Sequence, residues 1–362
     1  MKSLFKKIAH QGLSLLNPEA AHRLSIRALQ SGLFSAFPAH KDTRLNVKIA
    51  GINFSNPLGM AAGYDKNAEV PVELLKLGFG FVEIGTLTPK PQEGNPRPRI
   101  FRLIEDQAII NHLGFNNAGH CAAFSRLSTI KKTAPIGINI GANKDSKDFV
   151  SDYVSGIHRF FTLASYFCIN ISSPNTPSLR NLQMKENLGR LLSHVLQARE
   201  EERIETGKFV PIFLKISPDL LEQELDDIAS EILSHKIEGL TISNTTLSRE
   251  GLKNQIEHKK NGGLSGSPLF LKSTAILAKM RQRVGPNIAI IGLGGISSTE
   301  DVLEKIMAGA NIVQLYTAMI YDGISLPKRI LKGLSDFLDK EKKSSLEEIR
   351  GIRTEYWAKK DV

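Results

Sequence analysis

The chain has 362 residues, of which 41% are hydrophobic and 23% charged, the composition of a globular protein and not of a disordered one. Its two cysteines, Cys121 and Cys168, exclude a disulfide scaffold and a zinc or iron–sulfur site built from cysteines alone. The net charge of +10 suits nucleic acid, anionic lipid or phosphorylated small molecules as partners. This charge gathers at the start, where residues 1–48 hold eight basic and two acidic residues.

The first forty residues predict two short helices. One covers Leu4 to about Leu16, and Asn17-Pro18-Glu19 then ends it and begins a second helix that runs to about Leu33. Two helices this short cannot bury both apolar faces against each other, so they pack either on the main domain or in a membrane interface. The sequence contains neither a transmembrane run of about 18 apolar residues nor a recognisable signal peptide, which favours a location in the cytoplasm or on that side of a membrane.

From Asn56 onward, short apolar runs alternate with helical patterns. The runs are rich in β-branched residues and nearly continuous in apolarity, as strands buried on both faces should be. They cover 57–61, 81–85, 136–141, 167–171, 212–216, 239–243, 288–292 and 312–316. The helical patterns cover 70–77, 118–127, 149–161, 186–202, 221–234, 268–284, 298–308 and 326–337. Eight such units predict an α/β fold, a (β/α)8 TIM barrel with an N-terminal two-helix extension, over a doubly wound open sheet.

The chain therefore divides into three parts. Residues 1–43 form an amphipathic helical hairpin, residues 44–338 the barrel, and residues 339–362 a charged C-terminal tail in which Trp357 is the only bulky anchor. The intervals after the second and sixth predicted strands are long, and on this fold extra residues in such loops build active sites.

The carboxyl ends of the predicted strands, where this fold places its chemistry, carry amides, hydroxyls and two lysines. This set offers no carboxylate pair for glycoside hydrolysis and no histidine cluster, so no metal site is expected. Lys215 lies on a buried strand, which is costly unless it meets negative charge, so it is either a Schiff-base nucleophile or the partner of an anionic ligand. Gly294-Gly295 and Tyr316-Thr317 predict a phosphate cradle, although the glycine spacing does not match the dinucleotide fingerprint.

In these stretches the chain resembles the quinone-dependent (class 2) dihydroorotate dehydrogenases, from about residue 17 to about residue 337. The matching segments are 56–59, 61–66, 83–86, 111–117, 170–176 and 262–266. The resemblance implies FMN-dependent oxidation of (S)-dihydroorotate to orotate in pyrimidine biosynthesis, with a membrane quinone as the electron acceptor. It also implies that Ser173 is the catalytic base that takes the C5 proton of the substrate, where soluble members of the family use cysteine.

The resemblance assigns further site residues by position. Substrate-binding residues would be Lys66, Asn111, His112, Leu113, Gly114, Phe115, Asn170, Asn175, Asn244 and Thr245. FMN-binding residues would be Ala62, Gly63, Tyr64, Asp65, Lys66, Thr86, Asn139, Asn170, Lys215, Ser243, Gly266, Gly295, Tyr316 and Thr317. The quinone would meet His22 and Arg102 beneath the hairpin. Tyr64 stands where the family often has leucine, so its hydroxyl needs a partner.

The resemblance also implies that the hairpin docks on an anionic membrane surface, the cytoplasmic face of the inner membrane. It implies no nucleic-acid partner, and a monomer in preference to an obligate oligomer. The competing interpretations are another FMN barrel such as a tRNA dihydrouridine synthase, an aldolase that uses Lys215, and a membrane-bound scaffold without activity. The intact set of Lys66, Asn170, Ser173 and Lys215 favours the dehydrogenase.

Overall fold

The computed structural model describes residues 16–32, 40–176, 178–253 and 260–362. At its centre lies a closed barrel of eight strands, in which each strand runs parallel to both neighbours. These strands are β3 (Leu58–Met60), β4 (Phe81–Leu87), β7 (Ile136–Ile140), β8 (Tyr166–Asn170), β9 (Ile212–Ile216), β10 (Gly239–Ile242), β12 (Ala289–Leu293) and β13 (Ile312–Leu315). The predicted barrel is confirmed.

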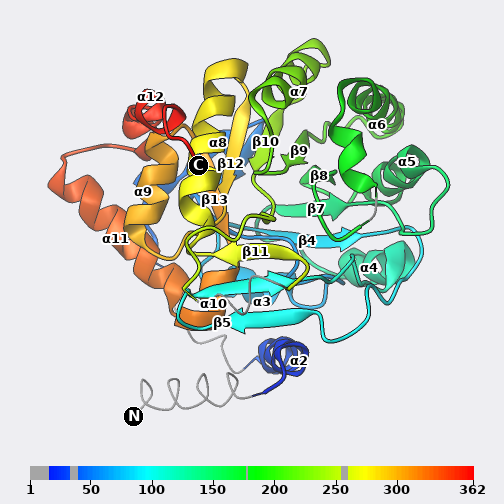
Figure 1. The fold of residues 1–362 in the computed structure, drawn as a ribbon, viewed down its shortest axis with the longest axis horizontal. Helices are drawn as coiled ribbons and strands as arrows, with labels where there is room; N and C mark the ends of the chain where they lie inside the picture. Colours follow the sequence, from blue (N-terminus) through cyan, green and yellow to red (C-terminus); the bar gives the residue numbers. More distant parts are fainter. Residues whose placement is uncertain (1–15, 33–39, 177, 254–259) are drawn as a thin grey trace.

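Helices surround the barrel, and each helix that the sequence predicts between barrel strands or after the last one is present, with ends that differ by a few residues (Figure 1). They are α3 (Pro71–Lys76), α4 (Gly119–Ser128), α5 (Phe149–Phe160), α6 (Lys185–Thr206), α7 (Glu222–Ser234), α8 (Leu269–Val284), α9 (Thr299–Met307) and α11 (Leu326–Lys340). A further short helix that the sequence analysis did not predict, α10 (Thr317–Asp322), directly follows β13. This insertion brings the first turn of a helix to the end of the eighth strand.

A plug of aromatic side chains closes the amino-terminal end of the barrel. It consists of Phe54, Phe81, Tyr166 and Phe213, whose rings meet edge to face at centroid distances of 5.0–6.4 Å. Phe54 comes from a hairpin of β1 (Val47–Ile49) and β2 (Ile52–Phe54) that precedes the barrel. Because this end is filled by packed rings, a ligand reaches the barrel from the carboxyl ends of the strands.

The two long intervals build a small antiparallel sheet that the sequence analysis did not predict. Its strands are β5 (Ile100–Leu103), β6 (Ala108–Asn111) and β11 (Gly263–Gly266), in the order β11-β6-β5. β5 and β6 follow the second barrel strand along the chain, whereas β11 follows the sixth. Pairing them therefore ties the two longest loops of the barrel to each other.

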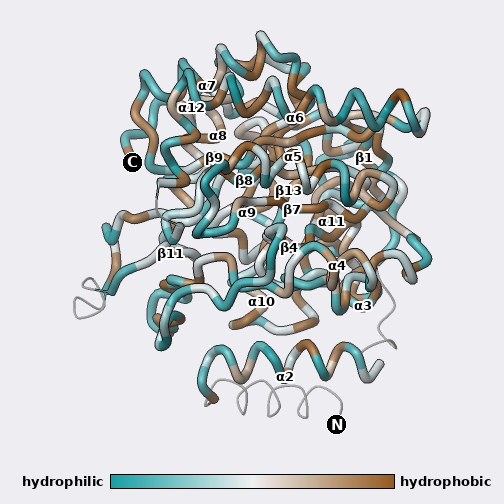
Figure 2. The backbone as a smooth tube through the Cα atoms, turned by 90° about the vertical axis from the view of Figure 1, so that its right-hand side faces the viewer, coloured by the Kyte–Doolittle hydropathy of each residue, from teal (hydrophilic) through white to brown (hydrophobic). Residues whose placement is uncertain are grey.

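Helix α2 (Pro18–Gln30) lies against β5 and α3 at one edge of the molecule (Figures 1 and 2). It begins as the sequence predicts: the Asn17 side chain accepts the N–H of Glu19 at 3.0 Å, and Pro18 occupies the first turn. It ends at Gln30, three residues before the predicted Leu33. The other expected helix, Leu4 to Leu16, lies outside the described residues except for Leu16. None of the described helices is long and apolar enough to cross a membrane.

The charged C-terminal segment is folded onto the barrel helices. After α11 it forms a short 3-10 helix (Leu346–Ile349) and then α12 (Thr354–Ala358), which packs against α8. Trp357 is buried, and its Nε1–H donates to the Glu304 carboxylate at 2.8 Å; Arg353 pairs with the same carboxylate. Trp357 is thus the anchor that the sequence suggested.

Candidate active site

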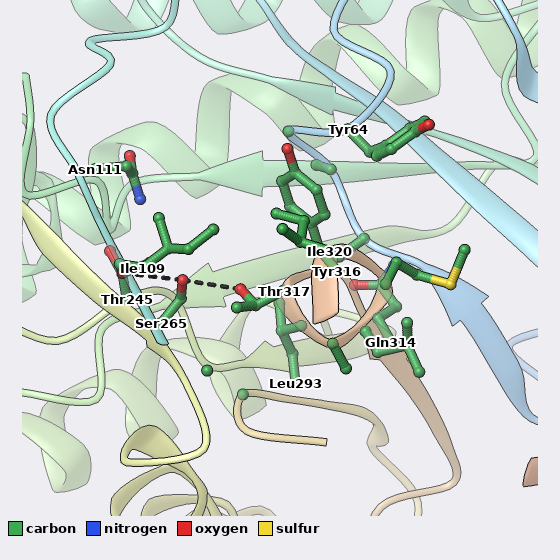
Figure 3. A pocket seen from close by; sticks show the side chains of 18 of the residues that line it. Tyr64, Ile109, Asn111, Thr245, Ser265, Leu293, Gln314, Tyr316, Thr317 and Ile320 are labelled. Atoms are coloured by element: carbon green, nitrogen blue, oxygen red, sulfur yellow. Dashed lines mark hydrogen bonds between the residues drawn. The ribbon is translucent and has the colours of Figure 1, made fainter. Parts of the chain in front are cut away.

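A cavity of about 1120 Å³ lies at the carboxyl ends of the barrel strands. Its walls come from the strand-end loops, from the sheet of β5, β6 and β11, and from helices α2 and α10. Figure 3 shows part of this lining, including a hydrogen bond of 2.9 Å from the Thr317 hydroxyl to the Ser265 hydroxyl. Because α2 and the strand ends share one cavity, a ligand bound in the barrel lies on a continuous path to the N-terminal helix.

Most of the residues that the sequence analysis assigned to the site line this cavity. From the substrate and base set these are Lys66, Asn111, Leu113, Gly114, Phe115, Asn170, Ser173, Asn175, Asn244 and Thr245. From the cofactor and quinone sets these are Ala62, Gly63, Tyr64, Thr86, Lys215, Ser243, Gly266, Gly295, Tyr316, Thr317, His22 and Arg102. The fold thus places residues as far apart in the sequence as His22 and Thr317, which are 295 positions apart, around the same cavity.

Three of the expected residues do not line the cavity, because neighbouring protein groups occupy their side chains. The Asp65 carboxylate is fully buried and accepts the N–H groups of Glu69 and Val70, each at 2.8 Å, before α3. Asn139 donates to the Glu83 carboxylate at 2.7 Å, and the His112 ring meets the Asn175 side chain at 3.2 Å. In this structure these three side chains support residues that do line the cavity, and their direct contact with a ligand stays a prediction.

Ser173 lies in the loop after β8, with 5% of its surface exposed. Its Oγ accepts the N–H of Asn175 at 3.2 Å. The Asn175 side chain in turn donates to the carbonyl of Asn111 at 3.1 Å and to its side-chain oxygen at 3.2 Å. The hydroxyl is thus held in a loop whose amides are fixed from β6, and it donates no hydrogen bond to a described residue.

Asn170, the last residue of β8, is the centre of a buried amide network. Its Nδ2 donates to the Thr86 hydroxyl at 3.0 Å and to the Asn139 side-chain oxygen at 3.2 Å. Its Oδ1 accepts from the Ser172 hydroxyl and from Asn244 Nδ2, both at 3.2 Å. These contacts lock strands β4, β7, β8 and β10 into one arrangement of donors and acceptors.

The sequence analysis missed two polar residues beneath this network. Glu83 is fully buried in β4, and its carboxylate accepts from Asn139, Tyr166 and Gln314 at 2.7–2.9 Å. Gln314 of β13 lines the cavity, and its buried Oε1 has no hydrogen-bond partner among the described residues. The signal was available, since both residues interrupt apolar strands as Asn170 and Lys215 do.

The loop after β12 offers backbone donors beside α10. Gly294 and Gly295 both have positive φ, at 110° and 77°. Residues with a side chain rarely adopt this backbone conformation. A Cβ on Gly295 would lie 2.5 Å from the Cα of Phe270, which excludes any side chain there. Within the described chain the N–H of Gly295 makes no hydrogen bond, so it is available to an anionic oxygen.

At the other end of the cavity, Tyr64 connects the barrel to α2. Its hydroxyl donates to the Ser25 hydroxyl at 3.0 Å, which supplies the partner that the sequence analysis required. Its ring meets His22 and Tyr316 edge to face, at 5.2 and 5.6 Å. Burial lowers the pKa of His22 to about 3, helped by the charge of Lys66, so its imidazole is neutral at physiological pH.

Two lysines face the cavity. Burial lowers the pKa of Lys66 to about 8, while the Glu19 carboxylate opposes this effect. Lys215 is 5% exposed at the end of β9, and its ammonium makes no hydrogen bond to a described residue. A buried cation without a hydrogen-bond partner that faces an open cavity is a ready partner for a ligand with negative charge.

Comparison with known proteins agrees with this geometry. Residues 44–338 match the family model described as dihydroorotate dehydrogenase. Curated proteins named dihydroorotate dehydrogenase (quinone) are similar over the whole chain: one from Rhizobium johnstonii is 60% identical over 99% of both chains, and one from Sinorhizobium fredii is 59% identical over 100% of both.

Solved structures give the same result. The dihydroorotate dehydrogenase of Eimeria tenella in complex with ferulenol is 38% identical, with a TM-score of 0.88 over 93% of this chain and 95% of that one. Its ligand-free form is 39% identical, with a TM-score of 0.87 over 92% and 99%. The chain therefore belongs to the dihydroorotate dehydrogenase family, in the quinone-dependent class that the curated relatives represent.

Proposed function

We propose that the chain oxidises (S)-dihydroorotate to orotate with FMN as its flavin and a membrane quinone as the final electron acceptor. The observation that carries this proposal is the single cavity that Ser173, the amides of Asn111, Asn170, Asn175 and Asn244, and residues of α2 line together. Two half-reactions with different partners require these features. Oxidation of dihydroorotate needs a base and amides that bind a heterocycle, and reduction of the quinone needs an opening toward the N-terminal helix.

The residues fit FMN at three places. The Oε1 of Gln314 lacks a donor and the ammonium of Lys215 lacks an acceptor among the described residues, and the hydrogen-bonding edge of a flavin would satisfy both. The N–H of Gly295 would hold the phosphate, and the Thr317 hydroxyl would join it by exchanging its hydrogen bond to Ser265 for one to the phosphate. When bound, FMN supplies an acceptor for the hydrogen and electron pair that leave C6 of the substrate.

Ser173 would take the proton from C5 of dihydroorotate. A hydroxyl is a weak base, so it needs a second group to carry the proton onward. The Oγ1 of Thr176 is buried and has no hydrogen-bond partner among the described residues, and it is our candidate for that relay. Lys66 would neutralise the substrate carboxylate, while Lys215 would offset the negative charge that accompanies the transferred electrons.

The quinone would enter where α2 meets the cavity, beside His22 and Arg102. The Arg102 guanidinium donates to the Leu16 carbonyl at 2.8 Å, just before α2. Leu16 and Leu24 are 42% and 47% exposed on this part of the chain, and Lys2, Lys6 and Lys7 precede them. We infer a monomer that binds peripherally to the anionic cytoplasmic face of the inner membrane through this region, without nucleic acid as a partner.

The test is an anaerobic stopped-flow experiment with the full chain as purified. Mixing with dihydroorotate should bleach the flavin absorbance, and a soluble quinone should then restore it. Flavin that does not bleach would reject dihydroorotate as the substrate. Absence of flavin from protein shown not to have lost it would favour an aldolase that uses Lys215.

A further inference from the structure

Helix α2 is joined to the barrel by an ion pair at its first turn. The Glu19 carboxylate accepts Nε–H and Nη2–H of Arg99 at 2.8 and 3.1 Å, and it pairs with Arg97 at 3.1 Å. The Arg99 side chain is 3% exposed and that of Arg97 is 59% exposed. Exposed ion pairs contribute little to stability, so the pair with Arg97 matters less. Arg99 is therefore the buried partner that connects Glu19 to the interior.

Arg99 uses its remaining donors to shape the segment between β4 and β5. Its Nη1 donates to the carbonyls of Glu93 and Asn95 at 2.6 and 2.8 Å, and its own carbonyl accepts the N–H of His112 at 2.8 Å. A guanidinium presents its donors in one rigid plane, so its orientation decides where both carbonyls lie. The Glu19 carboxylate fixes that orientation from the opposite side.

Asn95 continues this connection to the substrate side of the cavity. Its side chain donates to the Asn175 carbonyl at 3.1 Å, and its N–H donates to the Leu113 carbonyl at 3.0 Å. Packing is close here, because a Cβ on Gly114 would lie 2.8 Å from Asn95 Nδ2. Asn175, Leu113 and Gly114 all line the cavity, so a shift of Asn95 would move its wall.

Lys66 responds to the same ion pair. The Glu19 carboxylate raises the pKa of the Lys66 ammonium and the Arg99 guanidinium lowers it, against the larger lowering by burial. The Glu19 carboxylate at the start of α2 thus favours the charged form of the cavity lysine, and the neighbouring Arg99 opposes it. This is a second route, independent of the hydrogen bonds, from α2 to the substrate side.

We propose that Glu19 is a positioning residue for dihydroorotate, which acts through Arg99 and Asn95 on Asn175 and on the loop 111–115. Helix α2 then serves the substrate half of the reaction as well as quinone access. This inference rests on the proposed function, because it takes dihydroorotate and orotate as the ligands of this side of the cavity.

The test measures orotate binding to the oxidised full-length flavoprotein, from the change in flavin absorbance and without turnover. Glu19→Gln should raise the Kd for orotate about tenfold, and Glu19→Asp, which keeps the charge, should recover most of the loss. Arg27→Gln changes an exposed charge on the same helix and should leave the Kd unchanged. In steady state, Glu19→Gln should raise the KM for dihydroorotate more than the KM for a soluble quinone.

An orotate Kd within twofold of the wild-type value, or a change in the quinone KM alone, would overturn the proposal and reduce Glu19 to an anchor of α2. If Glu19→Gln loses its flavin or does not fold, Asn95→Ala cuts the same connection inside the barrel loop, and the same outcomes apply to it. Failure of the proposed function is distinguishable, because the wild-type protein itself would then not bind orotate.

Discussion

At Ser173 the proposed reaction depends on a weak base whose position is set by its own loop. Ser173→Ala should retain flavin, because among the described residues the Oγ makes one hydrogen bond, from Asn175 of the same loop, and supports no other element. Flavin reduction by dihydroorotate should slow by about 10²- to 10⁴-fold, the usual contribution of a general base. Anaerobic stopped-flow absorbance measures this rate directly.

The control for this variant is Ser193→Ala, which removes an exposed hydroxyl from α6. It should reduce its flavin at the wild-type rate. If Ser173→Ala also reduces its flavin within about threefold of the wild-type rate, another group takes the proton and Ser173 does not hold the assigned role.

Lys66 gives the substrate side a predicted pH dependence. Its pKa of about 8 means that the ammonium is present below pH 8 and is lost as the pH rises through that value. Orotate is an anion, so its Kd should rise between pH 7 and pH 9.5. Lys66→Arg keeps its charge over this range and should flatten the rise. Equal pH profiles for the two proteins would show that Lys66 is not the titrating group.

The family resemblance assigned most of the lining residues, whereas the residue pattern alone singled out a few, because a polar residue within an apolar strand has few structural explanations. Asn170 and Lys215 were found by that argument, and Gln314 and Glu83 carried the same signal without being interpreted. Whether a side chain reaches a ligand or a neighbour cannot be read from spacing. Asp65 shows this, since its carboxylate turns back to cap the chain before α3.

At the scale of elements, the loop between β12 and α9 is expected to hold the cofactor, and a substitution in it tests this expectation. Gly295→Ala places a Cβ against the backbone of Phe270 in α8, so the loop must shift and its free N–H with it. The variant should be purified with severalfold less flavin than the wild type, measured as the ratio of flavin to protein absorbance.

Gly207→Ala is the matched control for strain at positive φ. Gly207 ends α6 with a φ of 68°, close to the 77° of Gly295, but a Cβ there meets nothing within 4 Å. An alanine in this conformation costs about 1–2 kcal/mol at either position. Equal flavin content in the two variants would mean that the Gly295 loop does not hold the cofactor.

The barrel was more predictable than the elements added to it, for a physical reason. Each barrel strand is covered on both faces, so its residues form a continuous apolar run. The strands of the small sheet have four residues each, some of mixed character such as Gly263–Gly266, and they exist because two distant loops pair. Pairing between segments 152 residues apart leaves no local pattern.

At the scale of the whole molecule, one end of the barrel is closed by packed side chains and the other end holds the cavity. The aromatic plug closes the amino-terminal end, so the cavity lies at the opposite end with α2, and the proposed substrate, cofactor and quinone would all bind there. The charge distribution would also orient the protein on an anionic membrane, because most of the excess positive charge lies in the part of the chain around α2.

That distribution predicts where the protein touches an anionic membrane. Lys6→Gln with Lys7→Gln should weaken binding to vesicles that contain phosphatidylglycerol by about 1 kcal/mol per charge, or roughly 10- to 30-fold, in a sedimentation assay at low salt. The matched control, Lys359→Gln with Lys360→Gln, removes the same charge after α12, at the edge of the molecule opposite α2 (Figure 1). It should bind vesicles like the wild type, and both proteins should lose affinity as salt rises. Equal weakening by the two double variants would mean that net charge, and not the region around α2, draws the protein to the membrane.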